Sequence, residues 1–118
     1  MYNIERSDDM NFLPSKDIIV KNATGKDLKD IYLTYEGLEK HPLKIHYIAK
    51  GGFQKRVLIV NHLIKPSELK LFYYKNNYKE ELLAYDNLNS HDLRTLTLSI
   101  SLKDDKLFTS IAFNIKNY

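Results

Sequence analysis

The last third of the chain alternates apolar and polar residues so regularly that it predicts two paired strands. The apolar rows are Leu96, Leu98, Ile100 and Leu102, then Leu107, Ile111, Phe113 and Ile115. Period two is the side-chain period of a β-strand. A hairpin loop centred on Asp104-Asp105 sets Leu102 opposite Leu107, Leu98 opposite Ile111 and Leu96 opposite Phe113. Both rows then share one face, and a one-residue slip would expose one of them to water.

Similar strand signals recur upstream at roughly ten-residue spacing, separated by Gly, Asn and Pro. They lie at 18–20, 28–35, 43–49, 56–61 and 69–74. This pattern predicts an all-β fold: an immunoglobulin-like antiparallel β-sandwich of seven to eight strands that ends in the C-terminal hairpin.

Residues 79–86 fit two structures. Tyr78, Leu82 and Tyr85 fall at helical spacing, and the intervening Glu and Leu residues have good helix propensity. The segment is nevertheless short, lacks helix caps and follows the turn-forming pair Asn76-Asn77. We therefore expect a strand that pairs with 69–74.

The alternation also assigns faces to the middle strands. Ile31, Leu33 and Tyr35 should point into the core. In the next strand, Ile45, Tyr47 and Ala49 share one face, and Lys44, His46, Ile48 and Lys50 share the other. Val57-Leu58-Ile59-Val60 is apolar at every position, which predicts a strand that is covered on both sides or that crosses an edge of the sandwich.

The chain of 118 residues is long enough for one domain and too short for two separate cores. We expect a flexible N-terminal arm at 1–16 and a single β-sandwich domain at 17–118. Met1–Leu13 has no apolar run. This favours a cytoplasmic protein without a membrane partner, or a secreted one if a leader has been removed.

Composition excludes some chemistries and disfavours others. With no cysteine there is neither a disulfide framework nor a thiolate site. The net charge is only +3, and lysine outnumbers arginine 15 to 3 among the 18 basic residues. Because bidentate recognition of phosphate and guanine favours arginine, this balance disfavours a dedicated nucleic-acid binder.

Several segments resemble uncharacterised small β-sandwich proteins of low-GC Gram-positive bacteria. They are Val20–Lys26, Leu28, Ile31, Tyr35-Glu36-Gly37, Gly51, Leu69–Tyr74 and Lys79-Glu80-Glu81 to Tyr85. The resemblance covers residues 17–101 and departs at Arg56–Ile64, which is more apolar than a connecting loop should be. These are turn and core residues, so the resemblance implies an immunoglobulin-like fold and carries no activity.

No motif indicates catalysis, a cofactor or a metal. His41, His46, His62 and His91 include no pair at the spacing that points two imidazoles one way. Asp8-Asp9 and Asp104-Asp105 are adjacent carboxylates without a calcium-loop pattern. Phosphate-binding and nucleophile-elbow motifs are missing from the sequence. We therefore expect a protein that is not an enzyme.

One constellation points to recognition. If Leu69, Leu71 and Tyr73 face the core, an aromatic and basic set faces outward: Tyr32, Lys44, His46, Ile48, Lys50, Phe72 and Tyr74. Such a face suits a protein partner, with the aromatic side chains as anchors. The alternative structural interpretation is that the N-terminal arm, a loop or a homodimer mate covers these side chains.

The sequence therefore predicts a non-enzymatic protein-interaction module. A bacterial accessory, immunity or phage-encoded inhibitor role fits its size and composition. A second hypothesis is an OB-like barrel that binds single-stranded nucleic acid by stacking bases on the same aromatic residues.

Overall fold

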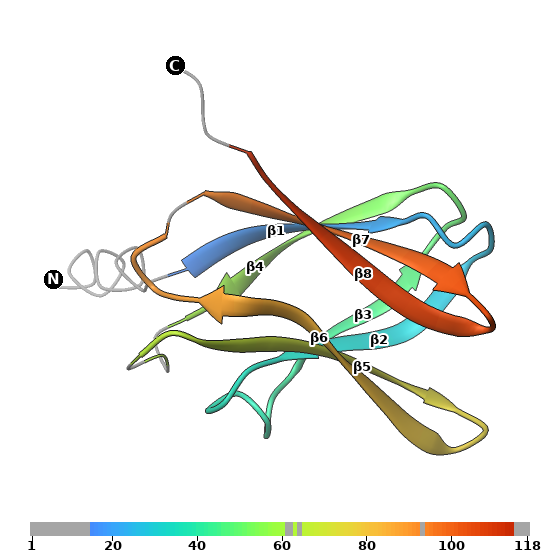
Figure 1. The fold of residues 1–118 in the computed structure, drawn as a ribbon, viewed down its shortest axis with the longest axis horizontal. Coiled ribbons are helices and arrows are strands. Elements are labelled where there is room, and N and C mark those ends of the chain that lie inside the picture. The colour runs from blue at the N-terminus through green and yellow to red at the C-terminus, as the bar shows by residue number, and fades with distance from the viewer. Residues whose placement is uncertain (1–14, 61–62, 64, 93, 115–118) are drawn as a thin grey trace, which may run out of the picture.

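The computed structural model describes residues 15–60, 63, 65–92 and 94–114. These residues form eight strands in two sheets and no helix (Figure 1). The strands are β1 (Ser15–Asn22), β2 (Leu28–Thr34), β3 (Leu43–Ile48), β4 (Phe53–Ile59), β5 (Ser67–Lys75), β6 (Tyr78–Leu88), β7 (Thr95–Lys103) and β8 (Lys106–Asn114). The predicted all-β class and strand number are confirmed. Among the described residues, no helix is present that could span a bilayer.

Each sheet contains four strands. The first has the order β4-β1-β7-β8 and the second has the order β3-β2-β5-β6. Neighbouring strands are antiparallel except β1 and β7, which run parallel. Every sheet therefore needs strands from both halves of the chain, and neither half can close a sheet alone.

The C-terminal hairpin has the predicted register. Leu102 pairs with Leu107, Leu98 with Ile111 and Leu96 with Phe113. At the turn, Asp104 and Asp105 have φ of 52° and 65°. Positive φ at both central residues is the conformation of two-residue hairpin turns whose twist matches that of the strands.

The uncertain segment 79–86 is a strand, as expected. It lies within β6 and pairs antiparallel with β5 across Asn76-Asn77, which have φ of 52° and 69°. Tertiary pairing outweighs the helix propensity of its Glu and Leu residues.

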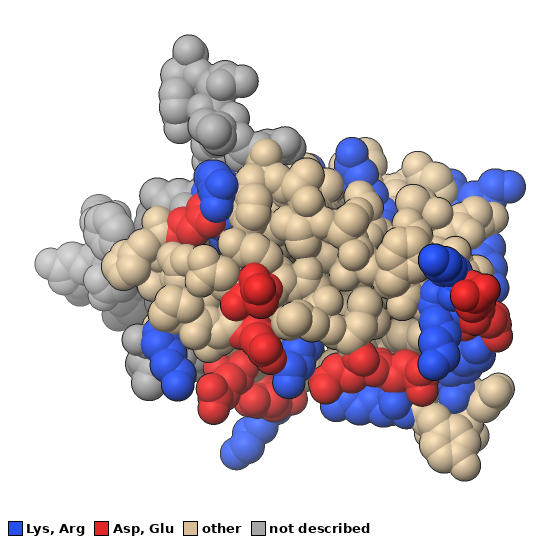
Figure 2. Space-filling model, viewed as in Figure 1, with Lys and Arg blue, Asp and Glu red and all other residues tan. Residues whose placement is uncertain are grey.

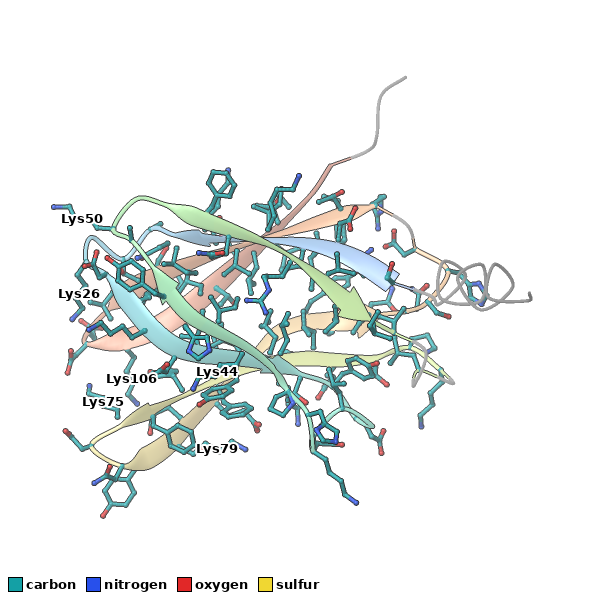
Figure 3. The ribbon with its side chains drawn as sticks, turned by 180° about the vertical axis from the view of Figure 1, so that it is seen from behind. Lys26, Lys44, Lys50, Lys75, Lys79 and Lys106 are labelled. Carbon is teal, nitrogen blue, oxygen red and sulfur yellow. The ribbon has the colours of Figure 1, made fainter. Side chains whose placement is uncertain are left out.

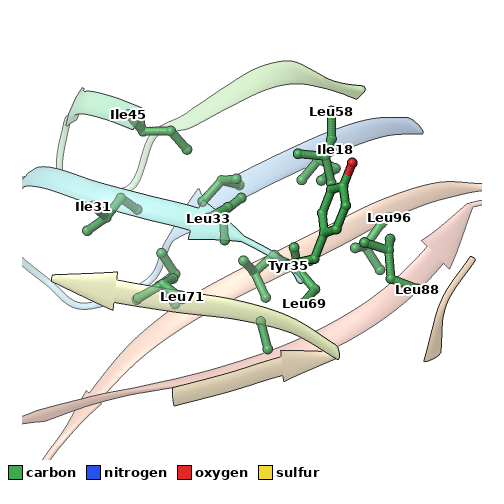
Figure 4. Packing of buried hydrophobic residues seen from close by; sticks show 14 of the residues in the cluster. Ile18, Ile31, Leu33, Tyr35, Ile45, Leu58, Leu69, Leu71, Leu88 and Leu96 are labelled. Carbon is green, nitrogen blue, oxygen red and sulfur yellow. The ribbon is translucent and has the colours of Figure 1, made fainter. Parts of the chain in front are cut away.

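One apolar core fills the space between the sheets (Figure 4). Ile31, Leu33 and Tyr35 are each at most 1% exposed, which confirms the predicted inward face of β2. The Tyr35 hydroxyl donates a hydrogen bond of 2.6 Å to the Ile59 carbonyl. This bond joins the end of β2 in one sheet to the end of β4 in the other.

The predicted faces of β3 are wrong at Ile48. Ile48 is 1% exposed and lies in the core, whereas Tyr47 is 42% exposed. Buried residues are thus three apart on β3, at Ile45 and Ile48. Their partners on β2, Ile31 and Leu28, are also buried and also three apart. Between them Asp30 has a φ of 55°, a left-handed conformation that interrupts the regular alternation of the strand.

Two further predictions need correction. Of the two structures predicted for 57–60, the strand covered on both sides is wrong. β4 lies at the edge of its sheet and is covered on one face only: Leu58 is 2% exposed, but Val57 is 53% and Ile59 is 36% exposed. At the N-terminus, most of the predicted arm 1–16 lies outside the described residues. Its last two residues, Ser15 and Lys16, belong to β1 and pair with Ile59 and Leu58.

Candidate protein-binding face

Three aromatic side chains form a cluster on the outer face of the second sheet. Tyr32 on β2 is directly opposite Phe72 on β5. Their rings stack with centroids 4.6 Å apart and planes 3° from parallel. Tyr74, two residues along β5, meets both rings edge-on at 6.1 Å.

Two lysines flank the stacked pair. The ammonium of Lys44 on β3 lies 5.6 Å from the Tyr32 ring centroid, and that of Lys79 on β6 lies 4.3 Å from the Phe72 ring centroid. The resulting row crosses the sheet as Lys44, Tyr32, Phe72, Lys79. We call these four residues together with Tyr74 the aromatic–lysine face.

This packing covers most of the aromatic surface. Phe72 is only 7% exposed although it lies on the outer side of the sheet, because Tyr32 and Lys79 lie against it. Tyr74 is 55% exposed and is the most accessible aromatic residue of the face. The face therefore presents ring edges, one tyrosine side chain and two ammonium groups.

Acidic residues moderate the charge of the lysines. The Asp30 carboxylate lies 3.7 Å from the Lys44 ammonium and 3.9 Å from His46 Nδ1. The Glu81 carboxylate lies 3.9 Å from the Lys79 ammonium. Because these pairs are solvent-exposed, each contributes little and both lysines remain available to a partner.

Four further lysines extend the positive charge toward one end of the sandwich. Lys26, Lys50, Lys75 and Lys106 lie around the turns at that end, on the same side as Lys44 and Lys79 (Figure 3). Lys75 is paired with Asp105 at 2.5 Å, and this hydrogen bond raises the pKa of Lys75. Figure 2 shows the basic residues gathered at that end, with acidic residues close by.

The predicted residues thus fall into three groups. Tyr32, Lys44, Phe72 and Tyr74 are brought together, while His46 is 78% exposed at the margin. Lys50 lies in the β3–β4 turn, where its backbone N–H donates a 2.8 Å hydrogen bond to Asp27 and lowers the pKa of that carboxyl. Ile48 is in the core and does not contribute to the face.

Lys79 was missing from the predicted set, although a signal for it exists. Closing the β5–β6 hairpin at Asn76-Asn77 places Lys79 opposite Tyr74, on the face that Tyr74 and Phe72 share. The predicted turn was therefore sufficient to find this lysine.

The described residues contain no group of three or more His, Cys, Asp or Glu side chains placed to hold a metal ion. A hollow of about 470 Å³ lies beside Phe72 on the outer side of the second sheet. Glu36, Glu39 and Lys70 are among its mixed acidic and basic lining. No protein-family model matches the chain, and comparisons with curated proteins and with solved structures give no match either.

Proposed function

We propose that this chain is a non-enzymatic protein-interaction module that binds its partner through the aromatic–lysine face. The observation that supports this most strongly is the row Lys44, Tyr32, Phe72, Lys79, with Tyr74 exposed at its side. Aromatic side chains held in place before binding lose little conformational entropy in a complex, and they are common binding hot spots.

A protein partner suits this geometry better than single-stranded nucleic acid does. Bases stack on accessible ring faces. Here Tyr32 and Phe72 cover one another, and Lys79 lies over Phe72. Ring edges with a tyrosine hydroxyl and ammonium groups instead suit backbone carbonyls and carboxylates of a protein surface.

The proposal extends to the fold type, the family resemblance and the location of the protein. Two four-stranded sheets packed around one core support an immunoglobulin-like sandwich, and the sequence motifs support the resemblance to small Gram-positive β-sandwich proteins. We further propose a cytoplasmic location.

The proposal is tested by capture of a partner from nuclease-treated lysate of the native cells. Wild-type protein should retain a specific protein, and Tyr74→Ala should reduce its recovery by about tenfold or more, as expected for loss of a hot spot. Tyr78→Ala is the matched control, since Tyr78 is 75% exposed and has no ring contact with the cluster.

Equal recovery by wild type and Tyr74→Ala would contradict the proposal. Retention from untreated lysate that is lost in the nuclease-treated lysate would instead favour the nucleic-acid hypothesis. The melting temperature of Tyr74→Ala should stay close to that of the wild type, because this side chain lies on the surface.

A further inference from the structure

A second candidate surface lies between β3 and β4, which are edge strands of different sheets. β3 and β4 are joined by the turn at Lys50–Gly52 and separate from there along their lengths (Figure 3). Between them is a hollow of about 420 Å³. We call it the β3–β4 groove. Its lining is Leu38, His41, Pro42, Leu43, Lys44, His46, Arg56, Val57, Leu58 and Ile59.

The β4 side of the groove is a free strand edge. β4 ends the strand order of its sheet, with β1 as its neighbour. The Asn22 N–H donates to the Gly52 carbonyl at 2.9 Å, which fixes the alternation of the β1–β4 ladder. It follows that the backbone N–H and C=O groups of Phe53, Lys55 and Val57 point away from β1. The position of the Ile59 carbonyl agrees, since it accepts the Tyr35 hydroxyl.

Arg56 gives this groove a specific charge. It shares the inward face of β4 with Leu58 and Gln54, and the Gln54 amide donates to the Tyr47 carbonyl on β3 at 3.1 Å. The Arg56 side chain is half-buried. Among the described residues no carboxylate oxygen lies within 4.0 Å of its guanidinium.

The rest of the lining has the same sign. Lys44, His41 and His46 join Arg56, and the described lining residues include no Asp or Glu. Asp30 lies beside Lys44 and His46 on the outer side of the sheet and partly neutralises them. Arg56 is therefore the guanidinium or ammonium group of the described lining that no described carboxylate pairs with, and most of the other lining residues are apolar.

We propose that the β3–β4 groove binds an extended acidic segment of a partner protein, which adds to β4 as a further strand and places a carboxylate on Arg56. Strand addition uses the outward backbone groups of Phe53, Lys55 and Val57 for affinity. The guanidinium would donate two hydrogen bonds to the carboxylate. The alternate, apolar side chains of the segment would pack beside the exposed Phe53 and Val57 on the other face of β4.

A second copy of this chain fits the edge poorly. Antiparallel pairing of two β4 strands about their centre would place Arg56 of one copy beside Arg56 of the other, with Lys55 close by. Like charges at opposed positions destabilise a strand pair. Edge lysines are a common protection against such self-association.

The test uses a capped peptide of alternating valine and glutamate as long as β4, with valine–lysine as the comparison peptide. We expect the acidic peptide to bind and to slow amide exchange at Phe53, Lys55 and Val57. Arg56→Gln should weaken this binding about tenfold, since hydrogen bonds to charged groups contribute on the order of 1.5–3 kcal/mol. Lys55→Gln is the matched control: it removes the same charge from the neighbouring residue, whose side chain is on the other face of β4.

Lys55→Pro adds a test of strand addition itself. It removes an outward N–H while leaving the β1 ladder its donors, so it should abolish binding without unfolding the sheet. Equal weakening by Arg56→Gln and Lys55→Gln would overturn the proposal, because it would show attraction by net charge alone. Concentration-dependent dimerisation that protects the same β4 amides would also overturn it. Tyr74→Ala should leave peptide binding unchanged, so failure here is separable from failure of the aromatic–lysine face.

Discussion

Tyr35 connects the two sheets through a single hydroxyl. Its side chain is 1% exposed, and the hydroxyl donates to the Ile59 carbonyl at 2.6 Å. Tyr35→Phe keeps the ring and removes this donor, so the free energy of unfolding should fall by about 1 kcal/mol. Urea denaturation measures the change. Tyr78→Phe, at the exposed first residue of β6, should leave stability unaltered. A Tyr35→Phe protein as stable as wild type would show that the bond contributes nothing.

An ionic cluster with a buried lysine lies at the same end of the sandwich, where Lys16 in β1 is paired with Leu58, the residue before Ile59. The Lys16 ammonium is 1% exposed and lies 2.7 Å from the Asp92 carbonyl and 3.4 Å from its carboxylate. Arg94 donates two hydrogen bonds to that carboxylate and stacks 3.9 Å from the Phe113 ring. The hydrogen bonds from Arg94 hold the pKa of Asp92 well below its usual range, and the nearby Lys16 adds to the effect.

This depressed pKa predicts how Asp92 affects acid stability. A carboxyl whose pKa is lower in the folded protein stabilises the fold above its unfolded pKa of about 3.9, and it loses that contribution as the pH falls through its folded value. Asp92→Asn should therefore cost about 2–4 kcal/mol near pH 7, where Lys16 loses its counter-charge. The difference from wild type should shrink as the pH drops toward about 2.

Denaturation curves across this pH range provide the measurement. Lys16→Met is the informative comparison, because it removes the buried charge and should cost less than Asp92→Asn. A larger loss of unfolding free energy in Lys16→Met than in Asp92→Asn would contradict this role of the cluster. So would an Asp92→Asn destabilisation that grows as the pH falls.

The β5–β6 hairpin depends on left-handed turn residues. Asn77 has a φ of 69° and an exposed side chain. A β-branched residue is strained there, so Asn77→Val should destabilise the protein by about 1–2 kcal/mol, whereas Asn77→Gly should be neutral or slightly stabilising. Thermal unfolding compares them. Equal stability of the two variants would mean that turn conformation is not limiting at this hairpin.

Local rules predicted the hairpins well because turn and strands agree. The register of β7 and β8 follows from alternation and a two-residue turn, and the same logic gives β6. The predicted faces of β3 are wrong because its partner strand β2 contains Asp30, whose left-handed backbone interrupts the alternation of β2. The exposed outer face of β4 was also missed, since an apolar run alone does not reveal which sheet a strand joins or whether it lies at an edge.

The candidate site was predictable in part for the same reasons. Alternation placed Tyr32, Phe72 and Tyr74 on outward positions, and the turn at Asn76-Asn77 implied Lys79. Stacking of Tyr32 on Phe72 depends on β2 lying beside β5, a non-local pairing that strand patterns do not specify. The same holds for the β3–β4 groove, whose walls come from different sheets.

At the level of the whole molecule, both candidate surfaces lie next to β3. Lys44 contributes to the aromatic–lysine face and to the rim of the β3–β4 groove. The outer face of the first sheet offers Lys21 and Lys55 without such an aromatic stack. The two proposals therefore predict that a protein partner covers the β3 side of the sandwich and leaves the outer face of the first sheet accessible at β1.

Lysine acetylation of the captured complex tests this central claim most directly. On partner binding, Lys44 and Lys79 should become several-fold less reactive than in the free protein, whereas Lys21 on β1 of the opposite sheet should react at an unchanged rate. Protection of Lys21 with Lys44 and Lys79 still fully reactive would contradict the proposed binding face, because the partner would then occupy the outer face of the other sheet.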